Sequence, residues 1–280
     1  MRAACLLLAV LPLAAQTAAE NPVKRQLKAG QPVIGATINV NSVDIAAEAA
    51  NMGFDFLWIE MEHSPISWET LRHMVLATRG LKGLPFVRVP VNEMWTAKRA
   101  LDSGALGVIF PFTNSVELAR RAVAACRYPP VGLRGSGPGL AAFRWPSPEG
   151  YYKFANENVF VVLIIEDQPG VDNVDEIVKV PGIDAIFIGP SDLSHQLGVP
   201  NQPNHPKFTA AIDKIVAAAK RQGLPVGRPA GSPQQVEEFK KQGFTFFQGP
   251  TALSLMSQSA RRLLDPMGKK PGQERMQTFY

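Results

Sequence analysis

Cysteine is scarce in this sequence, and its scarcity excludes a fold held together by disulfides. The 280 residues include two cysteines, Cys5 and Cys126. Cys5 lies in an N-terminal stretch that we expect to be removed, and a single remaining cysteine has no partner for an internal disulfide. We therefore interpret Cys126, which lies on a helix-like segment, as a buried apolar residue rather than a reactive thiol.

The chain also lacks a strong excess of charge and any stripe of basic residues interleaved with aromatics. Its formal net charge is +5. Part of that charge lies in a C-terminal tail rich in Gly, Pro and Gln, at Lys269, Lys270 and Arg275. Because a basic stripe is the usual footprint of a nucleic-acid-binding surface, we expect no nucleic-acid partner.

A single apolar run of membrane-like character opens the chain, from Ala3 to Ala15. Arg2 precedes this run, and the small residues Thr17 and Ala19 follow it, which is the pattern of a signal peptide. The run is shorter than the roughly 20 residues that a membrane-spanning helix needs, although an uncleaved anchor stays open as the alternative. We predict that residues 1–19 are a signal peptide and that the mature protein is secreted or periplasmic. No later stretch could span a bilayer, so we expect no stable membrane insertion after cleavage.

Eight short apolar runs alternate with helix-like stretches along the rest of the chain. The runs are mostly unbroken hydrophobic rather than alternating, which is typical of strands that are buried on both faces. They cover residues 32–40, 55–60, 84–89, 107–112, 160–166, 184–189, 224–229 and 244–249. Several helix-like stretches end in a glycine that suits a left-handed cap. These glycines are Gly53, Gly80, Gly104, Gly223 and Gly243.

The repeated order of strand, helix, glycine and strand predicts the fold class. It is that of an α/β protein with a single (β/α)8 TIM barrel. We assign the barrel to residues 20–265 and a flexible C-terminal tail to residues 266–280. The long segment 128–158 has no clear period, and we interpret it as a lid or a subunit-contact loop. A phosphate cradle around Arg134 is the weaker alternative, since no Lys-Ser/Thr pair and no helix directly follow its glycines.

Charged residues end or follow several predicted strands, on the side that forms the mouth of such a barrel. They are Glu62, His63, Arg88, Glu166 and Asp192. Glu166 closes an apolar strand, where an unpaired carboxylate would cost several kcal/mol, so it needs a cationic partner. Asp192 follows the next strand, and two carboxylates with water oxygens suit a hard divalent ion such as Mg²⁺ or Mn²⁺. The alternatives are a salt bridge between Glu166 and Arg88 and a helix N-cap role for Asp192.

His63 and Arg88 are the other candidates at the mouth. A histidine directly after a strand can act as a general acid or base near neutral pH, although a lone loop histidine can also be structural. An arginine in a buried strand needs an anionic partner. Arg88 could therefore hold a substrate carboxylate or an enolate oxygen, or it could pair with Glu166.

The stretches that carry these residues resemble the HpcH/HpaI aldolase family of metal-dependent pyruvate aldolases. The resemblance covers about residues 24–260 in order. It rests on FDFLWIEMEHSP, PFVRVPVN, RALDSGALGVIFP, RYPPVGLRGSG, VLIIE and GIDAIFIGPSDLS. It implies a barrel of the phosphoenolpyruvate/pyruvate type. It also implies a homo-oligomer, a hexamer built as a trimer of domain-swapped dimers.

The resemblance assigns metal binding to Glu166 and Asp192, with Mg²⁺ or Mn²⁺ as the ion and Co²⁺ as a further candidate. Arg88 matches the arginine that binds the pyruvyl oxygen. The backbone amides of Ser191 and Asp192 match those that hold the pyruvate carboxylate. The implied small-molecule ligands are a 2-keto acid and an aldehyde.

His63 matches the loop histidine of the family, and Glu62 matches an acidic residue beside it. Asp102 matches the aspartate that orients the histidine from the neighbouring subunit. The implied reaction cleaves a 2-keto-4-hydroxy acid to pyruvate and an aldehyde through an enolate, whose charge the metal and Arg88 compensate. The alternatives are another enolate-forming reaction, such as oxaloacetate decarboxylation, and a non-catalytic barrel that binds an α-keto acid. No lysine lies in the predicted strands to form a Schiff base.

Four residues depart from the pattern of the family. Glu60 stands where aspartate is usual, and Ile164 stands where glutamine is usual. Thr37 replaces an aromatic residue on the first strand, and Arg228 replaces an aliphatic residue on the seventh. These departures predict that the metal pair is kept and that the pyruvate pocket is altered.

Overall fold

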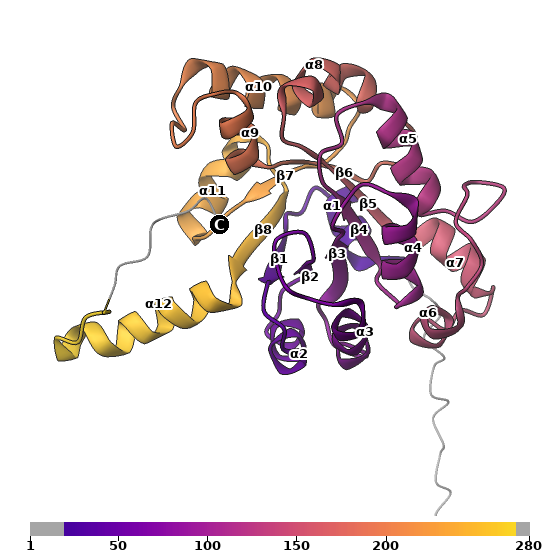
Figure 1. Ribbon diagram of the computed structural model, residues 1–280, viewed down its shortest axis with the longest axis horizontal. Helices are drawn as coiled ribbons and strands as arrows, with labels where there is room; N and C mark the ends of the chain where they lie inside the picture. Colours follow the sequence, from indigo (N-terminus) through magenta and orange to yellow (C-terminus); the bar gives the residue numbers. More distant parts are fainter. Residues whose placement is uncertain (1–19, 273–280) are drawn as a thin grey trace, which may run out of the picture.

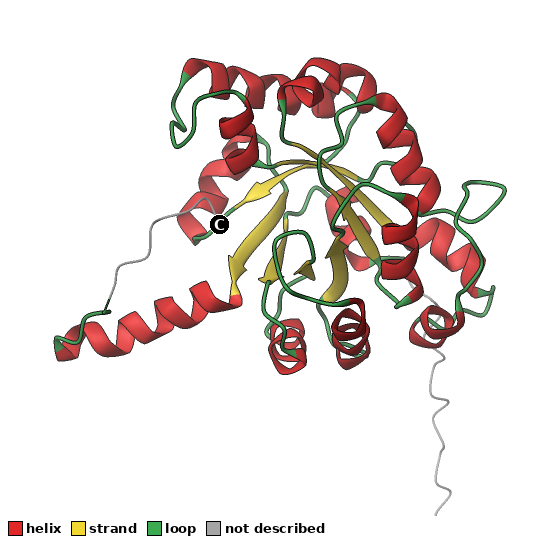
Figure 2. Cartoon of the chain, viewed as in Figure 1, coloured by secondary structure: helices red, strands yellow, loops and turns green. Residues whose placement is uncertain are grey.

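The computed structural model describes residues 20–272, and within them eight parallel strands close into a barrel in sequence order (Figure 2). The strands are β1 Val33–Ile38, β2 Phe56–Glu60, β3 Leu84–Arg88, β4 Gly107–Phe110, β5 Phe160–Ile165, β6 Ala185–Ile188, β7 Val226–Pro229 and β8 Phe246–Thr251. Strands β1 to β7 lie within the predicted apolar runs, and β8 overlaps the run 244–249. The prediction of a (β/α)8 barrel is therefore confirmed. The predicted signal peptide, 1–19, lies outside the described residues.

Helices surround the barrel on its outside (Figure 1). They are α1 Pro22–Lys28, α2 Val43–Asn51, α3 Trp68–Ala77, α4 Met94–Asp102, α5 Val116–Ala125, α6 Gly139–Arg144, α7 Tyr151–Asn158, α8 Gln168–Ile177, α9 Pro190–Gln196, α10 Pro206–Arg221, α11 Pro233–Gln242 and α12 Ala252–Leu264, followed by the 3₁₀ turn Asp265–Met267. Serine N-caps begin several of them, as Ser232 does for α11, and Gly243 ends α11 with a φ of 97°. All five predicted cap glycines have positive φ. Within residues 20–272 no helix combines the length and the apolar character that a bilayer crossing requires.

The segment 128–158 is more ordered than the sequence predicted. It contains α6 and α7, so the interpretation of the whole segment as irregular is wrong. The expectation that no helix follows its glycines is also corrected, since α6 begins at Gly139. Both helices are short, and their stability comes from packing rather than from a long helical period. The Arg144 side chain, for example, is buried and donates to the carbonyl oxygens of Val75 and Thr78.

Four phenylalanine rings fill the barrel interior toward the amino ends of the strands. Phe56, Phe86, Phe160 and Phe246 form a cycle of stacked pairs whose ring centroids are 4.7 to 5.6 Å apart. The neighbouring strand makes room with Gly35, because a Cβ there would lie 2.3 Å from the Phe56 ring. Since this layer closes the barrel like the packed layers of other TIM barrels, only the carboxyl end of the strands is left for a site.

Cys126 is buried as the sequence predicted. It is 0% exposed at the end of α5, and burial raises the pKa of its thiol to about 12. A thiol in this state is not a nucleophile near neutral pH.

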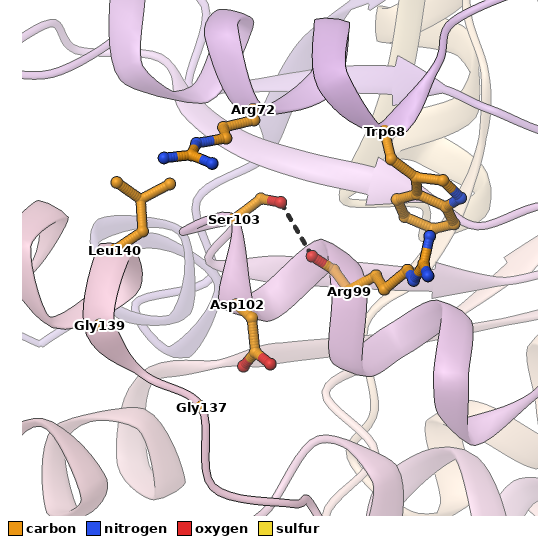
Figure 3. Close-up of a pocket in the computed structure, with 8 residues that line it drawn as sticks. All are labelled: Trp68, Arg72, Arg99, Asp102, Ser103, Gly137, Gly139 and Leu140. Atoms are coloured by element: carbon orange, nitrogen blue, oxygen red, sulfur yellow. Dashed lines mark hydrogen bonds between the residues drawn. The ribbon is translucent and has the colours of Figure 1, made fainter.

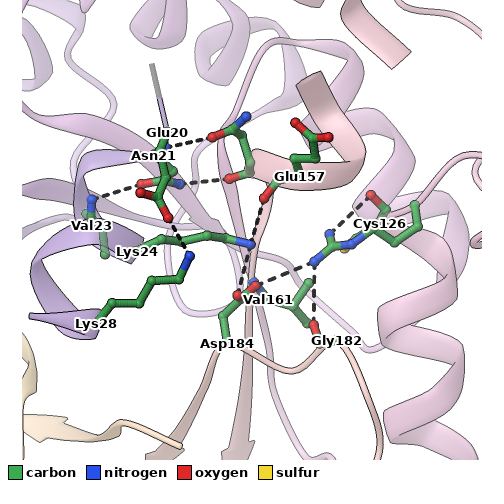
Figure 4. A network of polar contacts seen from close by, with 12 residues as sticks. Glu20, Asn21, Val23, Lys24, Lys28, Cys126, Glu157, Val161, Gly182 and Asp184 are labelled. Carbon is green, nitrogen blue, oxygen red and sulfur yellow. Dashed lines mark hydrogen bonds and ion pairs between the residues drawn. The ribbon is translucent and has the colours of Figure 1, made fainter. Parts of the chain in front are cut away.

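A polar network ties α1 to the amino ends of the strands (Figure 4). The Lys24 ammonium lies 2.9 Å from Asp184, and the same carboxylate lies 3.5 Å from Arg127 and accepts a hydrogen bond from the Val161 amide. The Lys24 side chain is 11% exposed, and burial lowers its pKa. The charge of Lys24 therefore depends on Asp184.

We expect Asp184→Asn to lower the free energy of unfolding by about 2–4 kcal/mol, because it leaves two buried cations without their counter-charge. Urea unfolding followed by circular dichroism measures the change. The matched control is Asp175→Asn, which breaks the exposed ion pair with Arg221 and should cost under about 1 kcal/mol. Equal losses in the two variants would contradict the role given to Asp184.

The last long helix, α12, departs from the usual arrangement of a barrel. It projects away from the barrel instead of covering β8 and β1 (Figure 1). No residue of α12 is buried, and Met256 and Leu263 are 62% and 70% exposed. An apolar helix face without a partner among the described residues is suited to contact with another molecule.

Candidate active site

The ends of β2 and β3 bring an arginine and two carboxylates together. Glu60 and Arg88 are direct neighbours in the strand register. The Arg88 guanidinium lies 2.9 Å from Glu60 through Nε and 2.8 Å from Glu62 through Nη2. All three side chains are largely buried, so these are ion pairs in an environment of low dielectric constant. Glu60 and Glu62 are partners of Arg88 that the sequence interpretation did not assign.

Glu60, which stands where aspartate is usual, contacts several groups around the site. Besides Arg88, its carboxylate accepts hydrogen bonds from the Trp58 indole at 3.2 Å and from the backbone amides of Glu62 and His63 at 2.8 and 3.1 Å. It is 4% exposed. The longer side chain therefore fits, and it holds both Arg88 and the loop that carries His63. A signal was present in the sequence, since a buried strand rarely ends in an acid without several donors nearby.

Glu62 lies between Arg88 and His63. Its Oε2 is 3.7 Å from His63 Nε2, and its side chain is 12% exposed while that of His63 is 49% exposed. Burial raises the pKa of Glu62 to about 7, against the lowering effect of Arg88 and with a further rise from Glu60 and Asp192. A carboxyl with this pKa can both give and accept a proton near neutral pH.

Glu166 is the most deeply buried acid at the mouth. It is 1% exposed, and its Oε1 accepts a hydrogen bond of 2.8 Å from the Phe112 amide. Its Oε2 is buried without a hydrogen-bond partner among the described residues. Gly189 permits this position, because a Cβ there would lie 2.3 Å from that oxygen. Burial raises the pKa of Glu166 to about 8, against the lowering effects of the Phe112 amide and the Arg88 charge and with smaller contributions to the rise from the charges of Glu62 and Asp192.

Asp192 is the third residue of α9 and is half-buried. The N-cap of this helix is Gly189, so the alternative of an N-cap role for Asp192 is wrong. Ser191 and Asp192 lie in the first turn, where backbone N–H groups have no acceptor within the helix. Because the charge of Asp192 affects both Glu62 and Glu166, the three carboxyl groups share one region of the mouth.

The donor set at the mouth fits a hard divalent ion better than a soft one. Within residues 20–272 there is no group of three or more His, Cys, Asp or Glu side chains arranged to hold a metal. Because Glu60 and Glu62 pair with Arg88, Glu166 and Asp192 are the two carboxylates left for an ion, and Glu166 offers a buried oxygen without a hydrogen-bond partner among the described residues. Carboxylates completed by solvent oxygens suit Mg²⁺ or Mn²⁺.

Asp102 lies apart from these residues. It ends α4, which returns along the outside of the barrel from the mouth, so Asp102 is near the opposite end of the strands. Its carboxylate pairs with Arg134 at 2.7 Å. It lines a cavity of about 410 Å³ that Trp68, Arg72 and Arg99 also line (Figure 3). The structure therefore does not bring Asp102 and His63 of the same chain together.

The other departures from the family pattern differ in their consequences. Arg228 points outward, where its guanidinium lies 3.7 Å from the centre of the Phe239 ring and 5.2 Å from that of Phe244. The expectation that Arg228 alters the pyruvate pocket is therefore wrong. Ile164 faces the interior one layer below Glu166, because residues two apart on a strand share a face. Thr37 donates to the Gly249 carbonyl at 2.8 Å.

A (β/α)8 barrel whose mouth carries buried carboxylates, an ion-paired arginine and a loop histidine belongs to the class of TIM-barrel enzymes that act at the carboxyl ends of the strands. Comparison with known proteins identifies the family. The model of the HpcH/HpaI aldolase/citrate lyase family matches residues 35–258, and the chain belongs to this family.

Individual relatives are similar over almost the whole chain. The 2-dehydro-3,6-dideoxy-6-sulfogluconate aldolase of Pseudomonas putida is 35% identical over 254 residues, which cover 91% of this chain and 100% of that protein. The 5-keto-4-deoxy-D-glucarate aldolase of Salmonella paratyphi A is 36% identical over 249 residues, which cover 89% and 97%. The crystal structure of an HpcH/HpaI aldolase/citrate lyase family protein from Burkholderia cenocepacia J2315 superposes with a TM-score of 0.82 at 32% identity, over 89% of this chain and 100% of that one. The predictions of the family and of an aldolase-type carbon–carbon lyase are confirmed.

Proposed function

We propose that this chain is a divalent-metal-dependent aldolase that cleaves a 2-keto-4-hydroxy acid derived from a sugar acid to pyruvate and an aldehyde. The observation that carries the proposal is the Glu166 carboxylate. It is buried at the mouth, and one of its oxygens has no hydrogen-bond partner among the described residues. Such an oxygen suits a cation, and Asp192 supplies a second carboxylate in the same region.

Glu166 and Asp192 are the residues that would hold the ion. When bound, a divalent ion supplies positive charge next to the keto oxygen. Arg88 presents its planar guanidinium to that oxygen, and the ion pairs with Glu60 and Glu62 hold it in position. The first-turn amides of Ser191 and Asp192 in α9 bind the substrate carboxylate, since such amides favour anions.

The proton transfers belong to His63 and Glu62. Their side chains are 3.7 Å apart, and the pKa of Glu62 is raised to about 7 by burial. Removal of the proton from the 4-hydroxyl group lets the electron pair of that oxygen form the aldehyde carbonyl while the C3–C4 bond breaks. The electron pair of the broken bond forms the pyruvate enolate, and return of a proton to C3 gives pyruvate. We assign the orientation of His63 to Asp102 of a neighbouring subunit, because Asp102 lies on the outer face of its own chain, where a second copy could contact it.

An assay of pyruvate release from a panel of 2-keto-4-hydroxy acids tests the function. We expect turnover with Mn²⁺ or Mg²⁺ and its loss after treatment with a chelator. Release of CO₂ from oxaloacetate, with no cleavage of any aldol, would favour the alternative enolate chemistry. Tight keto-acid binding without turnover would favour a binding protein.

We also propose that the chain is a homo-oligomer, a hexamer of domain-swapped dimers in which α12 packs on a second copy. The projection of α12 and the exposure of Met256 and Leu263 support this. Replacing both residues by Glu should move the sedimentation coefficient to that of a smaller species, because two charges would enter an apolar contact. The control is Gln258→Glu on the same helix, at an exposed polar position. Unchanged sedimentation of the double variant would contradict the role of α12.

Export remains part of the proposal. We propose that residues 1–19 are cleaved as a signal peptide and that the aldolase acts in the periplasm or outside the cell. The support is the sequence pattern, in which Arg2 precedes an apolar run and the small residues Thr17 and Ala19 follow it. N-terminal sequencing of protein from the native host tests it, and an intact cytoplasmic chain would contradict it.

A further inference from the structure

The segment that joins β4 to α5 holds a strained residue next to Glu166. Phe112 has a φ of 44°, in the left-handed region of the backbone map. Within residues 20–272, Phe112 and Asn201 are the non-glycine residues with positive φ. Asparagine tolerates this region because its short polar side chain can form local hydrogen bonds, whereas a phenylalanine there is an outlier. The conformation of Phe112 therefore needs a cause in the structure around it.

The side chain of Phe112 does not supply that cause. Its ring is 37% exposed, so the strain is not offset by the burial of a large apolar group. The backbone amide does have a partner, since it donates to Glu166 Oε1 at 2.8 Å. What the turn provides is therefore a main-chain donor to a carboxylate that is 1% exposed.

Two contacts fix this turn on either side of Glu166. The Thr113 amide donates to the carbonyl oxygen of Ile164 at 3.1 Å, two residues before Glu166. The side-chain amide of Asn114 donates to the carboxylate of Asp167 at 2.7 Å, one residue after it. A strained conformation persists where the surrounding structure over-determines it, and these contacts hold the turn across the end of β5.

The Thr113 side chain adds a third contact, to another loop of the mouth. Thr113 is 0% exposed, and its hydroxyl oxygen accepts a hydrogen bond of 2.8 Å from the Asn92 side chain in the segment that joins β3 to α4. The same hydroxyl donates to the Phe110 carbonyl at 3.3 Å. Because buried hydrogen bonds are costly to leave unmade, the turn cannot move without a loss in both loops.

We propose that the strained turn at Phe112 orients the metal ligand Glu166. The Phe112 amide fixes Oε1 and leaves Oε2, which has no hydrogen-bond partner among the described residues, available for the ion. A carboxylate that is already held in one orientation loses less conformational freedom when an ion binds. The inference rests on the proposed metal-dependent function, and it adds Phe112 and Thr113 as positioning residues that act through Glu166.

Two substitutions of Phe112 separate the backbone conformation from the ring. Phe112→Gly and Phe112→Val both remove the ring and keep the amide hydrogen, but glycine adopts positive φ freely and a β-branched valine does not. Calorimetric titration of metal-free protein with Mn²⁺ measures the affinity. We expect Phe112→Gly and Phe112→Asn to bind Mn²⁺ within about threefold of the wild type, and Phe112→Val to bind it about tenfold more weakly or worse.

Thr113→Val tests the support of the turn. It keeps the shape of the side chain and removes the hydroxyl group, so it should weaken Mn²⁺ binding about threefold to tenfold. A ring or packing role for the segment would instead predict equal affinities for Phe112→Gly and Phe112→Val, and that result would overturn the proposal.

Asn201→Val is the matched control for strain. It places valine at the other positive φ, 58°, at an exposed position between α9 and α10. It should lower the unfolding temperature in a chelator, as Phe112→Val does, but leave the Mn²⁺ affinity within about twofold of the wild type. Equal losses of Mn²⁺ affinity in Asn201→Val and Phe112→Val would overturn the proposal.

Turnover at saturating Mn²⁺ gives a readout that general destabilisation would not produce. Because the defect of Phe112→Val lies in metal binding, its kcat at saturating Mn²⁺ should return to within about threefold of that of Phe112→Gly. A deficit that persists at saturation would overturn the proposal. Absence of pyruvate release in every protein, the wild type included, would instead count against the proposed function, and the Mn²⁺ affinities would still decide the role of Phe112.

Discussion

Replacing Glu166 by Gln should lower aldol turnover by about 10³-fold and, at the same time, make the metal-free protein more stable. The first effect follows because the variant loses one of two carboxylates for the ion, and electrostatic stabilisation of a developing enolate is commonly worth that much. The second follows because Glu166 is buried and one of its oxygens has no hydrogen-bond partner within residues 20–272. Steady-state assays and thermal unfolding in a chelator measure the two effects.

The gain in stability expected for Glu166→Gln depends on pH, because the Glu166 carboxyl loses its proton at different pH values in the folded and the unfolded chain. The pKa of Glu166 is raised by burial from 4.5 to about 8 in the folded chain. Below pH 4.5 the group is protonated in both states and contributes no penalty. As pH rises from about 4.5 to 8, the unfolded chain loses this proton while the folded chain keeps it. The metal-free wild type should therefore lose up to roughly 1.4 kcal/mol per pH unit from Glu166 in that window. The variant should lack this contribution and keep only the one from Glu62, whose pKa is also raised by burial, to about 7.

The matched control for Glu166→Gln is Glu176→Gln, which removes an exposed carboxylate paired with Lys179. It should change neither turnover nor the pH profile of stability. Added Mn²⁺ should raise the unfolding temperature of the wild type and of this control, but not that of Glu166→Gln, because only a native-state ligand stabilises by mass action. Unchanged Mn²⁺ stabilisation in Glu166→Gln would place the ion elsewhere.

Much of the fold could be predicted from the sequence because the strands of a parallel barrel are buried on both faces and appear as apolar runs. The mouth could be predicted too, since parallel strands place their carboxyl ends on one side. Helices α6 and α7 could not, because they are short and depend on tertiary contacts such as the Arg144 hydrogen bonds. A helical period needs more turns than these helices have.

The site was predicted in its residue types and less well in its contacts. Which way a strand residue points depends on a register of period two, and one position decides whether Arg228 enters the pocket or packs against Phe239. The four donors that converge on Glu60 come from two strands and a loop, so no local pattern shows them. Helix α4 runs from the mouth back toward the amino ends of the strands, and Asp102 is its last residue. Asp102 therefore lies on the outside of the barrel, far from His63 of the same chain.

Arg88→Lys should lower turnover by about 10²–10³-fold and should lower the exchange of the pyruvate methyl protons with solvent to a similar degree. The guanidinium uses separate nitrogens for Glu60 and Glu62, and an ammonium cannot keep this planar geometry while also facing a keto oxygen. Because both reactions pass through the enolate, both need that positive charge. Deuterium incorporation into the methyl group of pyruvate, followed by NMR with saturating Mn²⁺, measures exchange, and pyruvate release measures cleavage.

His63→Ala should separate the two reactions that Arg88→Lys lowers together. His63 is the exposed member of the pair with Glu62, and its role is the proton of the 4-hydroxyl group, which cleavage requires and pyruvate exchange does not. We expect cleavage to fall about 10²-fold or more, while deuterium exchange stays within about threefold of the wild type. His73→Ala, at an exposed position on α3, is the matched control and should change neither rate. Equal losses of cleavage and exchange in His63→Ala would move His63 into the enolate step, and a wild type that exchanges no deuterium would exclude the enolate mechanism itself.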